Sequence, residues 1–278
     1  MQKKIHLVTG KGGVGKSVLA AALALRESQR GSSLLAELGD RSFYQDFLGL
    51  GPVSYHPTRY QSVDVVLWSG ADCLREYAKY LIKVDSLTKL FFENSVMRTF
   101  VNIAPALPEL AIMGKVTSGP RRHGPPLKYD YLTVDAFATG HFLALMRAAP
   151  AMAQAIPFGP MGEQGRGILK TLQDKELCEY HIVTLPEELP LKETLELKAQ
   201  LESEFGVIPK IYLNKAFNVH DNFRFPESDF GEYLKFQVSK TKFAQDYLNE
   251  KQISFTEIPW FLHGTGAEIV QSVVEVLK

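Results

Sequence analysis

The sequence predicts an α/β protein built on a doubly wound, mostly parallel sheet of about seven strands, with helices on both faces and one helical insertion. Short apolar segments alternate along the chain with longer segments rich in helix-forming residues, which is typical of parallel strands joined by crossover helices. The chain has 278 residues, of which 45% are hydrophobic and 22% are charged. This length and composition are sufficient for a sizeable folded core and argue against a disordered or low-complexity protein.

The first predicted unit is a strand over residues 5–9, a glycine-rich loop, and a helix over residues 16–27 that is rich in Ala and Leu. Further strands are predicted at residues 33–38, 63–68, 131–134, 181–185, 209–213 and 253–258. Residues 117–126 and 218–229 are predicted as loops from their Gly, Pro and polar content. Because the strand pattern resumes after each loop, we expect a single domain over residues 1–278.

Residues 71–115 interrupt this alternation with a predicted helical insertion. Leu74, Tyr77 and Ala78 begin an apolar i, i+3, i+4 spacing, and Pro105 and Pro108 are expected to break the helical pattern. The segment contains more large apolar residues than one buried stripe needs, including Tyr80, Leu81, Phe91, Phe92, Met97 and Phe100. Two interpretations stay open: these residues pack against a second helix layer or a dimer mate, or they form a nucleotide-gated apolar surface for a client.

Composition argues against several functions. The 31 basic and 31 acidic residues give a net charge of zero, so the chain lacks the positive field that nucleic-acid binding normally needs. The longest wholly apolar run, residues 18–25, is far shorter than the roughly 18 to 20 residues that span a bilayer, and the first residues do not resemble a signal peptide. We therefore expect a cytoplasmic protein without stable membrane insertion. Cys73 and Cys178 form no C-x-x-C pair, which favours buried free thiols.

Residues 10–17, Gly-Lys-Gly-Gly-Val-Gly-Lys-Ser, match the phosphate-binding pattern G-x-x-x-x-G-K-[ST] between a predicted strand and a predicted helix. In such a loop, backbone N–H groups and the positive end of the following helix surround the phosphates. Lys16 adds a charge at the β- and γ-phosphates, and the Ser17 hydroxyl is placed to bind Mg²⁺. The nucleotide-binding residues predicted here are Gly10, Gly12, Gly13, Val14, Gly15, Lys16, Ser17 and Val18.

A dinucleotide-binding turn is the competing interpretation of the same glycines. Gly10, Gly12 and Gly15 also satisfy G-x-G-x-x-G, and Glu37 lies 22 residues after Gly15 at a predicted strand end. The lysine and serine that follow Gly15 favour the phosphate-binding loop, because a pyrophosphate-binding turn does not call for a lysine there.

The loop resembles the deviant phosphate-binding loop of the MinD/ArsA class of dimeric ATPases, in which a second lysine follows the first glycine. Here that lysine is Lys11. The resemblance implies a homodimer in which Lys11 reaches the phosphates bound by the partner and supplies charge in the transition state, as an arginine finger does. It thereby gives Lys11 and Lys16 catalytic roles.

Residues 134–141, Val-Asp-Ala-Phe-Ala-Thr-Gly-His, resemble the D-x-A-P-T-G-H switch II segment of the arsenite-pump ATPase and the tail-anchored-protein targeting ATPase. Phe137 and Ala138 stand where that family has Ala-Pro. The resemblance implies that Asp135 holds a Mg²⁺-bound water at a strand end, while Gly140 permits the backbone to move when the γ-phosphate leaves. The predicted metal ligands are Ser17 and Asp135.

The base-binding residues are also implied by the resemblance. Asn214 follows a predicted strand in Ile-Tyr-Leu-Asn-Lys, where the family's asparagine hydrogen-bonds the adenine edge. Guanine-specific relatives carry an acid three residues later, and Phe217 stands there instead, which favours ATP. Pro259 lies in the segment that resembles the one closing over the base. The predicted cofactors are therefore ATP and Mg²⁺.

Two departures from the family pattern bear on activity. The family's aspartate that orients the attacking water is expected at Gly39, counting back from Gly49, and the nearby acids are Glu37 and Asp40. We assign the catalytic role to Asp40, with Glu37 as the alternative, and slow hydrolysis is one expected consequence of the displacement. The chain also has neither a C-x-x-C pair for an intersubunit zinc nor a cysteine triad for arsenite.

The resulting expectation is a Mg²⁺-dependent ATPase that couples ATP binding and hydrolysis to conformational change and to binding of an unidentified protein or small-molecule client. Two alternatives stay open: an ATP-dependent phosphotransferase or ligase acting on a small molecule, and a nucleotide-binding scaffold that does not hydrolyse ATP.

Overall fold

The computed structural model describes residues 4–82, 106–158, 160–220 and 223–278, and it confirms the α/β class. Its centre is an eight-stranded sheet with the strand order β3-β4-β2-β5-β1-β6-β7-β8. The strands are β1 (Lys4–Gly10), β2 (Ser33–Leu38), β3 (Thr58–Tyr60), β4 (Val63–Trp68), β5 (Tyr131–Asp135), β6 (Cys178–Thr184), β7 (Lys210–Ala216) and β8 (Phe255–Pro259). All neighbouring strands are parallel except β3 and β4, so the sheet is mixed but mostly parallel.

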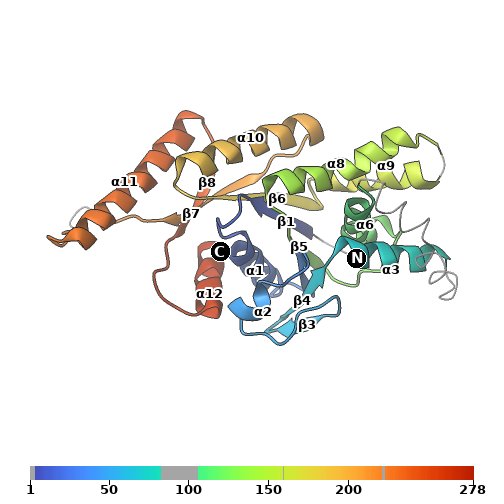
Figure 1. Cartoon of the computed structure of the whole chain (residues 1–278), viewed down its shortest axis with the longest axis horizontal. Helices are drawn as coiled ribbons and strands as arrows, with labels where there is room; N and C mark the ends of the chain where they lie inside the picture. Colours follow the sequence, from blue (N-terminus) through green and yellow to red (C-terminus); the bar gives the residue numbers. More distant parts are fainter. Residues whose placement is uncertain (1–3, 83–105, 159, 221–222) are drawn as a thin grey trace.

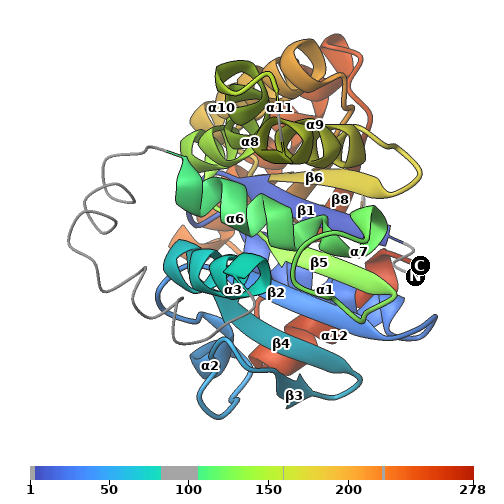
Figure 2. The same ribbon diagram turned by 90° about the vertical axis from the view of Figure 1, so that its right-hand side faces the viewer.

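Helices cover both faces of the sheet (Figures 1 and 2). They are α1 (Lys16–Glu27), α2 (Tyr44–Phe47), α3 (Gly70–Ile82), α6 (Leu107–Val116), α7 (Ser118–Arg121), α8 (Thr139–Ala155), α9 (Pro160–Leu172), α10 (Glu188–Phe205), α11 (Asp229–Glu250) and α12 (Gly266–Val276). One apolar core joins alternate residues of the central strands, such as Ile5 and Leu7, to α3, α6, α8, α9 and α10. The opposite core joins the other face, including Val8 and Leu35, to α1 and α12. This two-sided burial explains why the strands read as nearly continuous apolar runs.

β3 is the one strand of the sheet that the sequence did not predict, and it raises the predicted count of about seven strands to eight. It is three residues long and pairs antiparallel with β4, with Tyr60 opposite Val63. The tight connection places Gln61 at φ 49°, without the glycine or asparagine that usually marks such a hairpin. A short strand with no turn signal leaves little trace in a sequence pattern.

The predicted helical insertion is present at both of its ends, as α3 and α6, which pack against each other. Pro108 does not break a helix as expected, because it lies in the first turn of α6, where the missing N–H has no helical partner to lose. Pro105 and the apolar residues Phe91, Phe92, Met97 and Phe100 lie outside the described residues.

Two further expectations concern a predicted loop and a membrane-spanning helix. Residues 117–126 were predicted as a loop but contain the short helix α7, which follows α6 directly. Within the described residues, no helix is both long enough and apolar enough to cross a membrane.

Candidate functional site

The predicted phosphate-binding loop connects the central strand β1 to helix α1, at the carboxyl end of the parallel strands. Two of its glycines are required by close packing. A Cβ on Gly10, at φ 140°, would lie 2.3 Å from the Val183 carbonyl oxygen, and one on Gly15, at φ 95°, would lie 2.3 Å from Asn214 Nδ2. In contrast, a Cβ on Gly12 or Gly13 would meet nothing within 4 Å. The loop is therefore tightly held at its ends and open at its middle, as a phosphate cradle must be.

Lys16 is the first residue of α1, and its side chain folds back over the loop. Its Nζ donates to the Lys11 carbonyl oxygen at 3.2 Å. Burial lowers the pKa of Lys16 below its usual value, while the charge of Asp135 opposes this shift. The ammonium group thus lies at the loop, within the electrostatic influence of the carboxylate that ends β5.

Asp135 ends β5, next to β1, and it is buried. Its Oδ2 accepts a hydrogen bond from Tyr44 Oη at 3.0 Å, and its carboxyl group is also hydrogen-bonded by the Ser17 side chain. Burial raises the pKa of Asp135, while these two hydrogen bonds and the charge of Lys16 act in the opposite direction. The structure therefore brings together the two predicted metal ligands, and their oxygens are of the kind that Mg²⁺ prefers.

Tyr44 was not predicted as a site residue, yet it connects both of these groups. The residue is fully buried on the short helix α2, and its hydroxyl is also 2.9 Å from the Ser17 carbonyl oxygen. A single tyrosine in a short segment between two strands carries no motif, so no spacing in the sequence could have identified it.

The segment that resembles switch II leads from β5 into α8. The Phe137 carbonyl oxygen accepts a hydrogen bond from Thr9 Oγ1 at 2.9 Å, which ties the segment to β1 just before the loop. Gly140 is in the first turn of α8, and His141 is exposed, with its ring centroid 5.2 Å from that of Phe137. The segment therefore joins the candidate metal ligand Asp135 directly to a helix that packs on α6 of the insertion.

Lys11 forms an ion pair with Glu193 of α10, with 2.6 Å between Nζ and Oε1. About a third of each side chain is exposed, at 32% and 31%, so the pair lies at the surface beside the loop. Glu193 was not identified from the sequence, because it is 182 residues from Lys11 and lies in a helix with many acidic residues.

The two acids considered for the water-orienting role have very different surroundings. Glu37 is buried at the end of β2, in register with Asp135. Its carboxylate accepts hydrogen bonds from Ser42 Oγ at 2.6 Å and from Phe43 N at 2.7 Å, and burial raises its pKa. Asp40 is exposed in the turn that follows β2. Glu37 is therefore occupied in holding the start of α2, whereas the Asp40 carboxylate is open to solvent.

Asn214 and Pro259 lie at the same end of the sheet as the loop, on the adjacent strands β7 and β8. Asn214 Nδ2 donates to the Val14 carbonyl oxygen at 2.7 Å, and its Oδ1 accepts from Lys215 N at 2.9 Å. In this structure the Asn214 amide supports the phosphate-binding loop, and its contact with adenine stays a prediction. Pro259 is exposed. Val18, in the first turns of α1, packs partly against the core on that face.

Sequence comparisons relate this chain to ATPases. It is 30% identical over 227 residues to ATPase BagA of Mycobacterium tuberculosis, a match that covers 78% of this chain and 66% of the relative. It is 28% identical over 226 residues to an arsenical pump-driving ATPase of Escherichia coli and 26% identical over 223 residues to one of Acidiphilium multivorum. Each of these two matches covers 77% of this chain and 35% of the relative, so the chain spans about a third of the pump ATPases and about two thirds of BagA. No protein-family model matches the chain.

Proposed function

The chain belongs to the family of ArsA-type, anion-transporting ATPases, and from this premise we propose that it is a Mg²⁺-dependent ATPase. The observation that carries the proposal is the convergence of the open glycine loop, Lys16, Ser17 and Asp135 at one end of the central strand. This set supplies backbone donors, one cation and two oxygen ligands, which are the groups that a Mg²⁺-bound nucleoside triphosphate needs.

The division of labour among these residues follows from their chemistry. The loop N–H groups and the start of α1 bind the phosphates, and Lys16 neutralises part of their charge. Ser17 and Asp135 would hold the Mg²⁺ ion, directly or through a water, and Tyr44 keeps the Asp135 carboxylate oriented. When bound, Mg²⁺ neutralises charge on the β- and γ-phosphate oxygens.

The role expected for Lys11 requires a dimer. Its ammonium group is paired with Glu193 within the same chain, so this contact must open before Lys11 can reach the phosphates bound by a second copy. We therefore include in the proposal a homodimer whose assembly exchanges the Glu193 carboxylate for the partner's phosphates. The ion pair is partly exposed, and such pairs contribute on the order of 1 kcal/mol or less, so the exchange is energetically accessible.

The packing of helices between the candidate site and the insertion supports coupling to a client. The segment that follows Asp135 begins α8, α8 packs on α6, and α6 packs on α3. A change at the γ-phosphate that moved residues 136–141 would be transmitted to the helical insertion through contiguous contacts. The client itself, a protein or a small molecule, is left open by this proposal.

The decisive experiment measures nucleotide binding and phosphate release in the purified protein without any added small-molecule substrate. We expect Mg·ATP to bind in a calorimetric titration and phosphate to be released, and Lys16→Ala to abolish tight binding because a charge-assisted contact in an enclosed loop is lost. Binding retained by Lys16→Ala would overturn the site assignment. Binding without phosphate release would favour the scaffold alternative, and release only after a small molecule is added would favour the phosphotransferase or ligase.

A further inference from the structure

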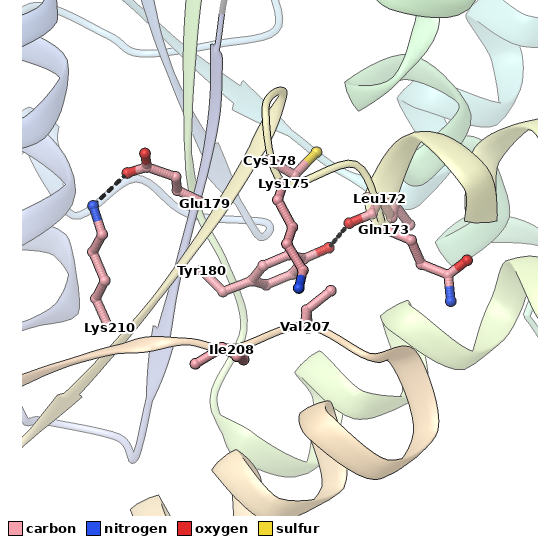
Figure 3. A pocket seen from close by; sticks show the side chains of 9 residues that line it. All are labelled: Leu172, Gln173, Lys175, Cys178, Glu179, Tyr180, Val207, Ile208 and Lys210. Carbon is pink, nitrogen blue, oxygen red and sulfur yellow. Dashed lines mark hydrogen bonds and ion pairs between the residues drawn. The ribbon is translucent and has the colours of Figure 1, made fainter. Parts of the chain in front are cut away.

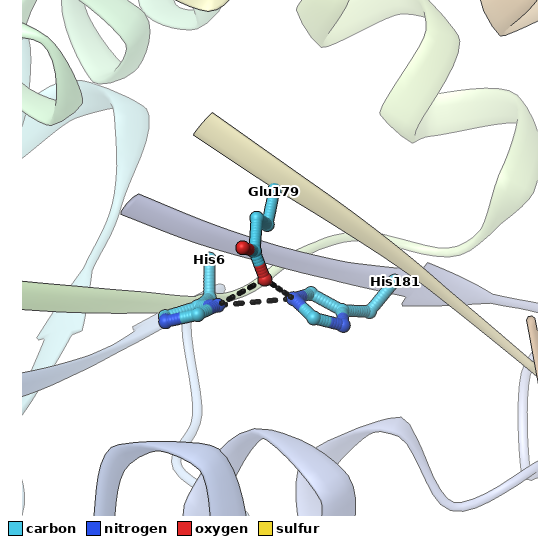
Figure 4. Close-up of side chains that lie close together, drawn as sticks. All are labelled: His6, Glu179 and His181. Atoms are coloured by element: carbon cyan, nitrogen blue, oxygen red, sulfur yellow. Dashed lines mark hydrogen bonds and ion pairs between the residues drawn. The ribbon is translucent and has the colours of Figure 1, made fainter. Parts of the chain in front are cut away.

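Three side chains that bind transition metals meet at the end of the sheet opposite the phosphate-binding loop. His6 is near the start of β1, and it is in register with Glu179 on the adjacent strand β6. His181 lies two residues further along β6, so it projects from the same face as Glu179. Figure 4 shows the three side chains converging, and both histidines are buried.

The three converging atoms are separated by distances that suit a shared metal ion. His6 Nδ1 lies 3.0 Å from His181 Nε2, and Glu179 Oε2 lies 3.7 Å from His6 Nδ1 and 3.9 Å from His181 Nε2. A point equidistant from these atoms lies about 2.1 Å from each, close to the roughly 2.0–2.2 Å of zinc bonds to nitrogen and oxygen. We propose that His6, His181 and Glu179 form a binding site for Zn²⁺ or a similar divalent transition metal, with an open fourth position.

The outward nitrogens of the two rings already face second partners of the kind that metal-binding histidines use. His181 Nδ1 lies 3.1 Å from Tyr212 Oη, and His6 Nε2 lies 3.7 Å from Glu27 Oε1. A carboxylate or hydroxyl behind the ring fixes the tautomer of a metal-bound histidine. Without a metal, a proton must lie between the two facing nitrogens, and His6 Nε2 has no hydrogen-bond partner among the described residues.

A bound metal ion would replace the proton between the two facing ring nitrogens, and the two rings would still carry the same total number of protons. Each neutral ring keeps one proton, on His6 Nε2 toward Glu27 and on His181 Nδ1 toward Tyr212, and both facing nitrogens become free to bind the metal. Burial also lowers the pKa of both rings, that of His6 to about 4, so the neutral form required of a ligand is present at pH 7.

The site has a cationic competitor and a route to solvent. Lys4 Nζ lies 3.1 Å from Glu179 Oε1, the oxygen that does not face the histidines, and can keep that contact when a metal is bound. Lys210 Nζ lies 2.9 Å from Oε2, the proposed ligand atom, but 59% of the Lys210 side chain is exposed, so it can turn into solvent. The Glu179 side chain is 23% exposed, so solvent reaches it directly. The pocket that Glu179 and Lys210 line beside Tyr180 lies on the opposite face of the sheet (Figure 3), because Tyr180 alternates with Glu179 and His181 along β6.

Cobalt titration of the full chain tests the site, because four-coordinate Co²⁺ absorbs visible light much more strongly than six-coordinate Co²⁺. The titration uses nucleotide-free protein in excess Mg²⁺, which occupies oxygen ligands but competes poorly for imidazole. We expect one saturating equivalent with four-coordinate absorption, displaced by Zn²⁺. We expect His181→Gln to weaken binding at least about 100-fold, whereas His263→Gln, at an exposed histidine, leaves it unchanged.

If His181→Gln does not fold, Lys210→Gln provides a second test. Lys210 is largely exposed, so we expect this variant to fold. Removing the competing ammonium should tighten Co²⁺ binding several-fold relative to the unmodified chain. The proposal is overturned by the absence of saturable four-coordinate binding, by unchanged affinity in a folded His181→Gln variant, or by unchanged or weaker affinity in Lys210→Gln.

Discussion

At the scale of single residues, the Tyr44 hydroxyl is the polar group on which the candidate metal site depends most directly. It is buried between the Asp135 carboxylate and the Ser17 carbonyl oxygen. Because burial raises the pKa of Tyr44 well above 10, the hydroxyl stays protonated and acts as a hydrogen-bond donor throughout the physiological range.

Tyr44→Phe removes this hydroxyl while keeping the ring. We expect a loss of about 1–3 kcal/mol in the free energy of unfolding, because two buried acceptors lose the one hydroxyl donor that they share, and a lower Mg²⁺-dependent rate of phosphate release. Urea denaturation and a phosphate assay measure the two effects. Tyr60→Phe is the matched control, since Tyr60 is also buried but lies on β3, where its hydroxyl interacts with Gln61. Equal effects of the two substitutions would contradict the role given to Tyr44.

Substitutions of Glu37 and Asp40 are expected to have different effects, because the two side chains have different surroundings. Asp40→Asn changes an exposed carboxylate, so we expect unchanged stability and ATP affinity but slower phosphate release, as for a residue that orients water. Glu37→Gln changes a buried carboxylate that accepts two hydrogen bonds, so we expect a lower melting temperature. If Glu37→Gln slows release more than Asp40→Asn at a temperature where both variants are folded, the catalytic role moves to Glu37.

At the scale of elements, the phosphate-binding loop contains one glycine that is closely packed, Gly15, and one that is not, Gly12. Gly15→Ala must adopt φ 95° and place a Cβ 2.3 Å from Asn214 Nδ2, so we expect it to lower the free energy of unfolding by roughly 1–3 kcal/mol. Gly12→Ala meets no atom within 4 Å, so we expect stability within about 0.5 kcal/mol of the unmodified chain.

The same two variants also test where the phosphates lie. We expect Gly12→Ala to weaken Mg·ATP binding in a calorimetric titration although the protein stays fully folded, because its methyl group enters the open part of the loop. Normal affinity in Gly12→Ala would show that the phosphates do not occupy this space.

Periodicity and motif spacing predicted the elements that are long or locally marked. Seven strands, the helix after the loop and both ends of the insertion follow from local patterns, whereas the candidate ligand Asp135 follows from the resemblance of residues 134–141 to a switch II segment. Tyr44 and Glu193 could not be predicted, because their roles depend on contacts 91 and 182 residues away in the sequence. The pairing of His6 with His181 has the same cause, since parallel strands with long crossovers join distant residues.

At the scale of the whole molecule, the expected homodimer makes Lys11 act on phosphates that its own chain does not bind. We expect Lys11→Ala to bind Mg·ATP but to lose phosphate release, since one transition-state charge of this kind is worth about 10³-fold or more in rate. Mixing this variant with Lys16→Ala should restore part of the activity, because the mixed dimer contains one site with an intact Lys16 and an intact partner Lys11.

Glu193→Gln supplies the control for this experiment, since it removes the contact that holds Lys11 within one chain. We expect it to promote nucleotide-dependent dimerisation, measured by light scattering, without loss of ATP binding. If mixed dimers form but release no phosphate, Lys11 does not act across the interface.

The strand order also fixes when the site can form as the protein is synthesised. The neighbours of β1 are β5 and β6, whereas β2, β3 and β4 are complete by residue 68 and can pair earlier. The segment from β1 to α1 therefore leaves the ribosome before β5, and β1 lacks a partner strand until residues 131–135 have followed it. During that interval an apolar strand and the apolar face of α1 are exposed on the nascent chain, a situation that favours protection by chaperones. Translation can therefore complete the nucleotide site only after β5, long after the phosphate-binding loop itself has been synthesised.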